Sequence, residues 1–114
     1  MLPSQPEFLR HILDECRYIL KVTAGKASEE VFADETLSKA IVRSLEIMGE
    51  ATKRLDPDFK TQHPHVEWKK IAATRDIMIH DYFGIDYDVV FHTIKNDIPA
   101  LQRELLRIIE LEGK

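Results

Sequence analysis

The sequence predicts an all-α domain: an up-down four-helix bundle with short extra helical turns. Apolar residues recur at spacings of three and four along four segments, which is the pattern of helices with one buried face. No segment alternates with a period of two, as a half-buried strand would. The 114 residues include only 4 Gly and 5 Pro, so long irregular stretches are not expected. Short connections between the four segments favour antiparallel neighbours.

The first helix is predicted from about Pro6 to Val22, with Ser4 as a possible N-cap and Gly25 beyond its end. Its apolar stripe includes the single cysteine, Cys16. A chain with one cysteine cannot form an internal disulfide, which indicates a reducing compartment. A thiol on an apolar stripe is more often a buried core group than a nucleophile. We therefore expect Cys16 to be structural.

The remaining helices are bounded by capping and breaking residues. Ser28 can start one helical turn, and Asp34 is the expected N-cap of the second long helix. The buried face of that helix is expected to consist of Leu37, Ala40, Ile41, Ser44, Leu45, Met48, Ala51 and Leu55, with Asp56-Pro57-Asp58 as its stop. The third helix is predicted over about Val66 to His80. The fourth is predicted from Asp86 or Asp88 to Leu111, with a kink or restart at Pro99.

Composition describes one folded domain, residues 1–114, with 44% hydrophobic and 32% charged residues. No apolar run exceeds three residues, so neither a transmembrane helix nor the apolar core of a signal peptide is expected. We interpret the protein as cytoplasmic. The net charge of −4 argues against a protein that coats nucleic acid with its whole surface. Any contact with nucleic acid must therefore be local.

Charge is segregated in the second half of the chain. Residues 60–80 carry Lys60, Lys69, Lys70 and Arg75 against Glu67 and Asp76, a net charge of +2. Residues 81–97 carry four Asp against Lys95, a net charge of −3. Ordinary solvated helix faces would explain this pattern equally well.

Arg75 is the anomaly of the third helix. At 100° per residue it falls in the middle of an apolar stripe formed by Trp68, Ile71, Ala72, Met78 and Ile79. A buried guanidinium needs an anionic partner, because it cannot lose its charge. Three alternatives remain open: an internal salt bridge, for example to Asp76 or Asp81, a snorkelling side chain, or an external anion.

His80 follows Arg75 by five residues, about 140° around a straight helix. The two side chains could converge where the helix ends, or across a dimer of two such helices. Tyr82 completes the pattern Arg75-x-x-x-x-His80-x-Tyr82. Singly, a histidine at a helix end and a half-buried tyrosine are usually structural.

The chain resembles the HepT-like ribonuclease toxins of the HEPN superfamily, whose motif reads here as RDIMIHDY, from Arg75 to Tyr82. The segments AIVRSLEIMGEATKRLDPDF, HPHVEWKKIAATRDIMIHDYFGID and IKNDIPAL also read like the family's blocks, in the same order. The resemblance implies a homodimeric bundle and a metal-independent endoribonuclease, the toxin of a type II/VII-like toxin–antitoxin pair. It also implies a minimal nucleotidyltransferase antitoxin that inhibits by binding, by transferring AMP from ATP to Tyr82, or by both.

The residue types fit that chemistry. His80 can transfer protons near neutral pH, and Arg75 can donate two hydrogen bonds to a phosphate. Tyr82 can donate another. Cleavage is expected to need no cofactor, with ATP and Mg²⁺ required only by the partner enzyme. The residue after the motif arginine is often Asn in the family, whereas here it is Asp76, which can hold Arg75 in place or neutralise it.

Other interpretations remain open. His63 and His65 flank Pro64, but no third metal ligand is near in the sequence, so no metal site is expected. The chain could instead be a non-catalytic module that docks a nucleotidyltransferase, or a structural domain in which Arg75 forms an interface salt bridge. Loss of function on removal of His80 would separate catalysis from docking.

Overall fold

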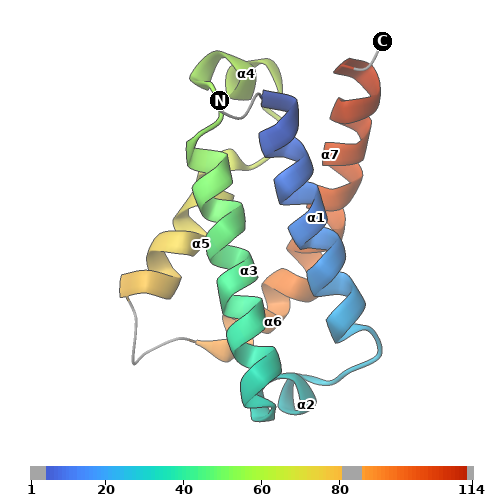
Figure 1. Ribbon diagram of the computed structural model, residues 1–114, viewed down its shortest axis with the longest axis vertical. Helices are drawn as coiled ribbons and strands as arrows, with labels where there is room; N and C mark the ends of the chain where they lie inside the picture. The colour runs from blue at the N-terminus through green and yellow to red at the C-terminus, as the bar shows by residue number, and fades with distance from the viewer. Residues whose placement is uncertain (1–4, 81–85, 113–114) are drawn as a thin grey trace.

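The structure, a computed structural model, describes the backbone of residues 5–80 and 86–112 and the side chains of residues 6–74 and 86–111. Within these ranges every regular element is a helix, which confirms the predicted all-α class (Figure 1). The long elements are α1 (Gln5–Thr23), α3 (Glu35–Lys53), α5 (Trp68–His80) and α7 (Ile98–Glu112). The short elements are α2 (Ser28–Ala33), α4 (Pro57–Gln62), α6 (Tyr87–His92) and the π-helical turn η1 (Thr93–Asp97).

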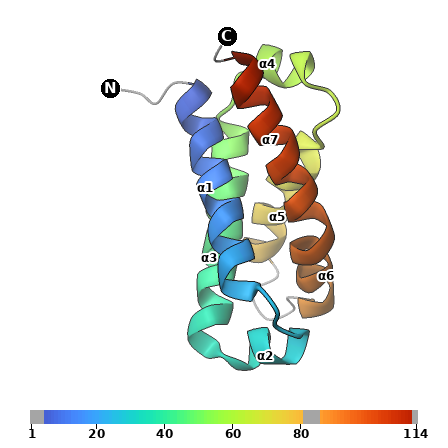
Figure 2. The same cartoon turned by 90° about the vertical axis from the view of Figure 1, so that its right-hand side faces the viewer.

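The four long helices run alternately up and down, as the short connections predict. Helix α3 lies between α1 and α5 and packs against both, while α7 packs against α1 (Figure 1). Figure 2 shows α7 beside α1, with α6 continuing the same column below it. Both ends of the described chain lie at the same end of the bundle, as expected for four antiparallel segments.

The predicted N-caps Asp34 and Asp86 and the short helix start at Ser28 are confirmed. The carboxylate of Asp34 accepts a hydrogen bond from the backbone N–H of Leu37 at 3.1 Å, so Asp34 caps α3. The carboxylate of Asp86 accepts from the N–H groups of Asp88 and Val89 and caps α6 in the same way. Ser28 does begin a short helix. The predicted N-cap Ser4 lies outside the described residues.

Asp56-Pro57-Asp58 does more than stop the second long helix. Asp56 accepts a hydrogen bond from the N–H of Asp58 at 2.9 Å, and Pro57 occupies the first turn of a further helix, α4. Proline is favoured there because the first N–H groups of a helix have no internal partner. The tripeptide therefore ends one helix and begins another, which was not predicted.

The fourth predicted helix contains a π-turn just before Pro99. The N–H of Ile98 donates to the carbonyl of Thr93, five residues earlier, which is the hydrogen bond of a π-turn. Because Pro99 has no N–H to donate, the i→i−4 ladder must break near this point. Restart at Ile98 places Pro99 in the first turn of α7. The predicted kink or restart at Pro99 takes the form of a π-turn within the helical backbone.

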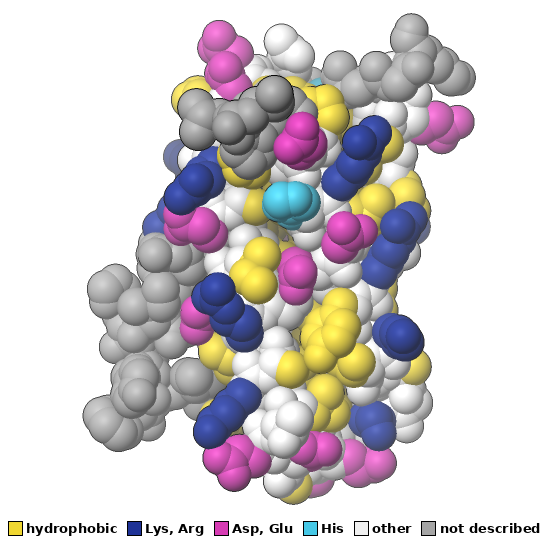
Figure 3. Space-filling model, viewed as in Figure 1, with side chains coloured by type: hydrophobic (Ala, Val, Ile, Leu, Met, Phe, Trp, Pro, Cys, Tyr) yellow, Lys and Arg dark blue, Asp and Glu magenta, His cyan; other side chains and the backbone are white. Residues whose placement is uncertain are grey.

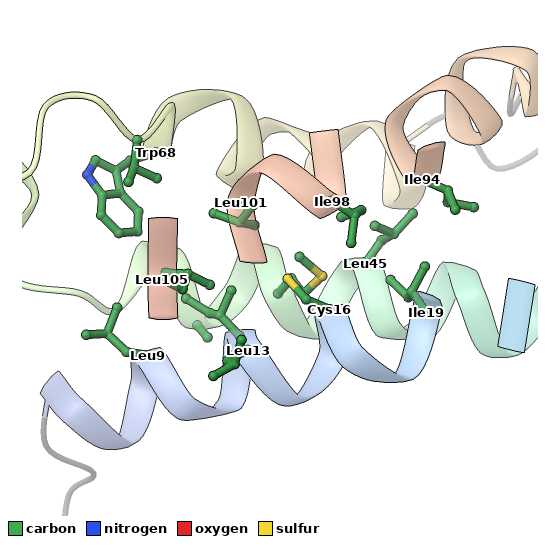
Figure 4. Close-up of a cluster of buried hydrophobic side chains, with 14 of the residues drawn as sticks. Leu9, Leu13, Cys16, Ile19, Leu45, Trp68, Ile94, Ile98, Leu101 and Leu105 are labelled. Carbon is green, nitrogen blue, oxygen red and sulfur yellow. The ribbon is translucent and has the colours of Figure 1, made fainter. Parts of the chain in front are cut away.

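The core is formed by apolar stripes of α1, α3 and the η1–α7 column, together with Trp68 at the start of α5 (Figure 4). Helix α1 contributes Leu9, Ile12, Leu13, Cys16 and Ile19, and the η1–α7 column contributes Ile94, Ile98, Leu101, Leu105 and Ile108. Cys16 is fully buried, and this burial, helped by the charge of Glu15, raises the pKa of its thiol to about 12. A thiol that stays protonated is a poor nucleophile, so the prediction of a structural Cys16 is confirmed.

The polar side of α3 is a solvated face, as its spacing predicts. Lys39 pairs with Glu35 at 2.8 Å and Arg54 with Glu50 at 3.2 Å, each across one turn. On the face shown in Figure 3, basic and acidic side chains are interspersed. No helix among the described residues is both long enough and apolar enough to span a membrane.

Candidate active site

Helix α5 carries three of the four predicted site residues: Arg75, Asp76 and His80. Its first turn is anchored by Trp68, whose ring is buried and whose Nε1–H donates to the carbonyl of His63 at 2.9 Å. Ile71 packs against the same core. The helix begins at Trp68 and not at Val66, because residues 63–68 form turns closed by hydrogen bonds such as Val66 N–H to His63 O. The described part of the helix reaches His80.

The regular backbone of α5 sets the angular positions of Arg75 and His80 around the helix axis. Positions 68 and 75 lie within about 20° of each other around the helix, so position 75 continues the side that Trp68 buries. Positions 69 and 80 also lie within about 20° of each other, so position 80 continues the side on which Lys69 is exposed. Arg75 and His80 therefore occupy different sides of one helix, about 140° and about 7.5 Å of axial rise apart.

The side chains of Arg75, Asp76 and His80, and the whole of Tyr82, lie outside the described part of the structure. Their assigned roles stay predictions. What the structure provides is the backbone frame: a helix that diverges from α3 towards one side of the bundle and is described as far as the motif histidine (Figure 1).

An ion pair ties α5 to the π-turn. Lys70 Nζ lies 3.1 Å from Asp97 Oδ2 and 3.7 Å from Glu67 Oε2. The hydrogen bond and attraction from Asp97 raise the pKa of Lys70 above its usual range. The basic stretch, residues 60–80, and the acidic stretch, residues 81–97, are therefore joined by an ion pair in the folded chain. Lys69, in contrast, is exposed and has no ion-pair partner among the described side chains.

The two histidines around Pro64 have different surroundings. His63 is buried, with its ring 4.7 Å from that of Phe59. His65 Nε2 lies 2.9 Å from Glu104 Oε2 on α7. Within the described residues, no group of three or more His, Cys, Asp or Glu side chains is placed to hold a metal ion.

A cavity of about 250 Å³ lies beside α5, between that helix and the η1–α7 column. Its apolar lining comes from Leu45, Met48, Val66, Ile71, Ile98 and Leu101. Its polar lining comes from His65, Glu67, Lys70, Thr74, Thr93, Asp97 and Glu104. Sequence reasoning did not identify it. The nearest signal in the sequence is Pro99, which follows the π-turn that contains the lining residues Thr93 and Asp97.

Fold and motif together define a small helical-bundle protein with an arginine and a histidine on one helix. The chain belongs to the HepT-like ribonuclease family: the family model described as "Ribonuclease HepT-like" matches residues 12–108, which include every motif position. The expected family and enzyme class, a ribonuclease, are therefore confirmed.

Named relatives agree with this assignment. The chain is 42% identical to "Putative RNase TTE0752" of Caldanaerobacter subterraneus subsp. tengcongensis, over 92% of this chain and 94% of that protein. It is 39% identical to "Putative RNase MJ1216" of Methanocaldococcus jannaschii, over 94% and 89% of the two chains. It is 38% identical to "Probable ribonuclease HepT" of Thermococcus cleftensis, over 90% and 93%. No solved structure matches the chain significantly.

Proposed function

We propose that the protein is a metal-independent endoribonuclease toxin in which Arg75 and His80 perform the cleavage. The observation that carries this proposal is the motif RDIMIHDY, whose Arg75 and His80 positions lie on one continuous helix in a chain of a ribonuclease family. The substrate is RNA, and the site of action is the cytoplasm.

The chemistry needs only proton transfer and charge stabilisation, because RNA carries its own nucleophile. His80 removes the proton of the 2′-hydroxyl as that oxygen attacks the adjacent phosphorus. The bond from phosphorus to the 5′-oxygen breaks, and that oxygen takes up a proton. Arg75 binds the phosphate through two N–H donors and stabilises the charge that develops on it. The products are a 2′,3′-cyclic phosphate and a 5′-hydroxyl.

The active species is a homodimer. A histidine and an arginine that act on one phosphate must lie within hydrogen-bond reach of it, yet the α5 backbone sets positions 75 and 80 on different sides of the helix. Two copies of α5 related by a two-fold axis would let Arg75 of one protomer face His80 of the other. The symmetric dimer would then contain two composite sites.

Inhibition by a minimal nucleotidyltransferase antitoxin completes the proposal. That partner, using ATP and Mg²⁺, would bind the toxin, transfer AMP to the hydroxyl of Tyr82, or do both. A bulky anion two residues beyond His80 would repel the RNA backbone and block the site. Intact-mass measurement after incubation with such a partner and ATP tests this step, and a Tyr82→Phe variant that still gains AMP would contradict the assigned acceptor.

The test of the cleavage step is digestion of bulk RNA by the purified protein in the presence of a chelator. Arg75→Ala and His80→Ala should each abolish cleavage while leaving the helical circular dichroism unchanged. Lys69→Ala, on the same helix, should keep the same products. Dependence on added metal, or 5′-phosphate products, would overturn the proposal. Wild type that is unmodified at Tyr82 and binds RNA without cutting it would favour a non-catalytic docking module.

A further inference from the structure

Helix α5 is held differently on its two sides. Among the described residues its extensive backbone contacts are with α3, and its side chains Trp68 and Ile71 pack in the core. On another side the cavity separates it from the η1–α7 column. There the ion pair between Lys70 of α5 and Asp97 of η1 joins the two walls at 3.1 Å. The direction of α5 relative to the column is therefore set less by packing than by polar side chains.

A second ion pair holds the turn that leads into α5 and not the helix itself. His65 Nε2 lies 2.9 Å from Glu104 Oε2 on α7, but His65 precedes the first residue of α5. Lys70 lies in the first turn of the helix, and Glu67, its other described carboxylate neighbour, belongs to the same stretch of chain and is farther away, at 3.7 Å. Asp97 is thus the carboxylate that ties α5 to the column.

A small change of direction at the start of α5 becomes a displacement at the motif. The backbone at position 80 lies about 18 Å along the helix axis from Trp68, at 1.5 Å per residue. A tilt of about 3° at Trp68 therefore moves position 80 by about 1 Å. Misplacement of a reacting group by about 1 Å can slow a reaction about 100-fold. The direction of α5 thus matters for any reaction that uses positions 75 and 80.

We propose that the ion pair between Lys70 and Asp97 is a positioning contact for the ribonuclease site. It fixes the direction of α5 against the η1–α7 column, and with it the places of positions 75 and 80. The inference rests on the proposed function, because cleavage is the reaction that depends on those positions. Both side chains are partly exposed, and an exposed ion pair adds little to overall stability, so its removal should free α5 and leave the bundle folded.

The first experiment measures the direction of α5 without cleavage. Residual dipolar couplings of backbone N–H groups give the angle between α5 and α7 in solution. Asp97→Asn keeps the shape of the side chain and removes its charge, and it should change this angle by about 3° or more, or reduce the couplings of α5 relative to those of α3. Unchanged angle and couplings in Asp97→Asn would overturn the inference.

The second experiment measures kinetics on an RNA oligonucleotide at a temperature where urea denaturation shows each variant to be folded. Lys70→Gln and Asp97→Asn should each lower kcat about fivefold and change KM less than about twofold, because placement is lost and no contact with RNA is removed. Lys69→Gln is the matched control: it removes the same charge from the same helix, and Lys69 has no ion-pair partner among the described side chains. It should keep the wild-type kcat.

Two kinetic outcomes would overturn the inference. Equal losses in Lys69→Gln and Lys70→Gln would assign the effect to the positive charge of α5 and not to the ion pair. Faster cleavage by Asp97→Asn would mean that Lys70 binds RNA once its carboxylate is removed. Absence of cleavage by the wild type would instead refute the proposed function, while the helix angle still reports on the ion pair.

The third experiment reverses the pair. Lys70→Glu and Asp97→Lys should each lower kcat at least as much as the neutral variants, because each places like charges side by side. The double variant restores opposite charges and should recover most of the kcat and the wild-type angle between α5 and α7. A folded double variant that recovers neither would overturn the inference.

Discussion

Two adjacent leucines on α7 test how the bundle is held together. Leu105 is fully buried and packs in the core near Leu9 and Leu13, whereas Leu106 is 40% exposed (Figure 4). Replacement of either leucine by alanine removes the same atoms from the same helix, and both residues are good helix formers. The difference between the two variants therefore measures burial alone.

The expected magnitudes differ several-fold. Leu105→Ala should lower the free energy of unfolding by about 3 kcal/mol, since it removes buried methyl groups and leaves a cavity in a close-packed core. Leu106→Ala should cost less than about 1 kcal/mol, because its side chain keeps much of its contact with water. With an unfolding entropy near 2.1 cal/mol/K per residue, the first change lowers the Tm by about 12 °C.

The assay is urea denaturation followed by the fluorescence of Trp68, the only tryptophan in the chain and a buried one. The transition midpoint should fall markedly in Leu105→Ala with an unchanged dependence of the free energy on urea concentration. Equal losses in the two variants, or a larger loss in Leu106→Ala, would refute the assigned orientation of α7.

Two further predictions concern the first half of the chain. Because burial raises the pKa of Cys16 to about 12, the thiol of the unfolded chain loses its proton at a lower pH than that of the folded chain, and the free energy of unfolding should fall as the pH rises from about 9 towards 12. Cys16→Ala should flatten this pH dependence when the free energy is measured by urea titration. An unchanged pH dependence in the variant would contradict the burial of the thiol. Asp34→Ala should lower the free energy of unfolding by about 1 kcal/mol, because the N-cap of α3 is lost. Asp34→Asn is the control that keeps a hydrogen-bond acceptor at this position. An equal decrease in both variants would show that the charge of Asp34, and not capping, is responsible.

Local signals in the sequence predicted the helices well, because capping and apolar spacing act over a few residues. Asp34 and Asp86 mark real helix starts, and the stripe through Cys16 is the buried one. The same signals are ambiguous where one residue can serve two elements. Asp56 was expected only to end α3, yet it also caps α4.

Only part of the candidate site could be predicted from the sequence. The positions of Arg75 and His80 on one helix followed from the spacing, and the structure confirms a continuous helix through both. The cavity depends on how far α5 lies from α7, which is set by tertiary packing and by the π-turn, and neither is readable from periodicity. The ion pair of Lys70 and Asp97 likewise joins residues that are 27 positions apart, a pairing that sequence spacing alone does not reveal.

The most direct test of the central claim is cleavage by mixed dimers. Arg75→Ala and His80→Ala proteins, each inactive alone, would be mixed under conditions that allow subunit exchange and assayed on RNA in chelator. A composite site across a two-fold axis predicts that activity returns to about a quarter of wild type, since about half of the dimers are mixed and each holds one intact site. No recovery, with exchange verified by mass spectrometry, would contradict a site shared between two protomers.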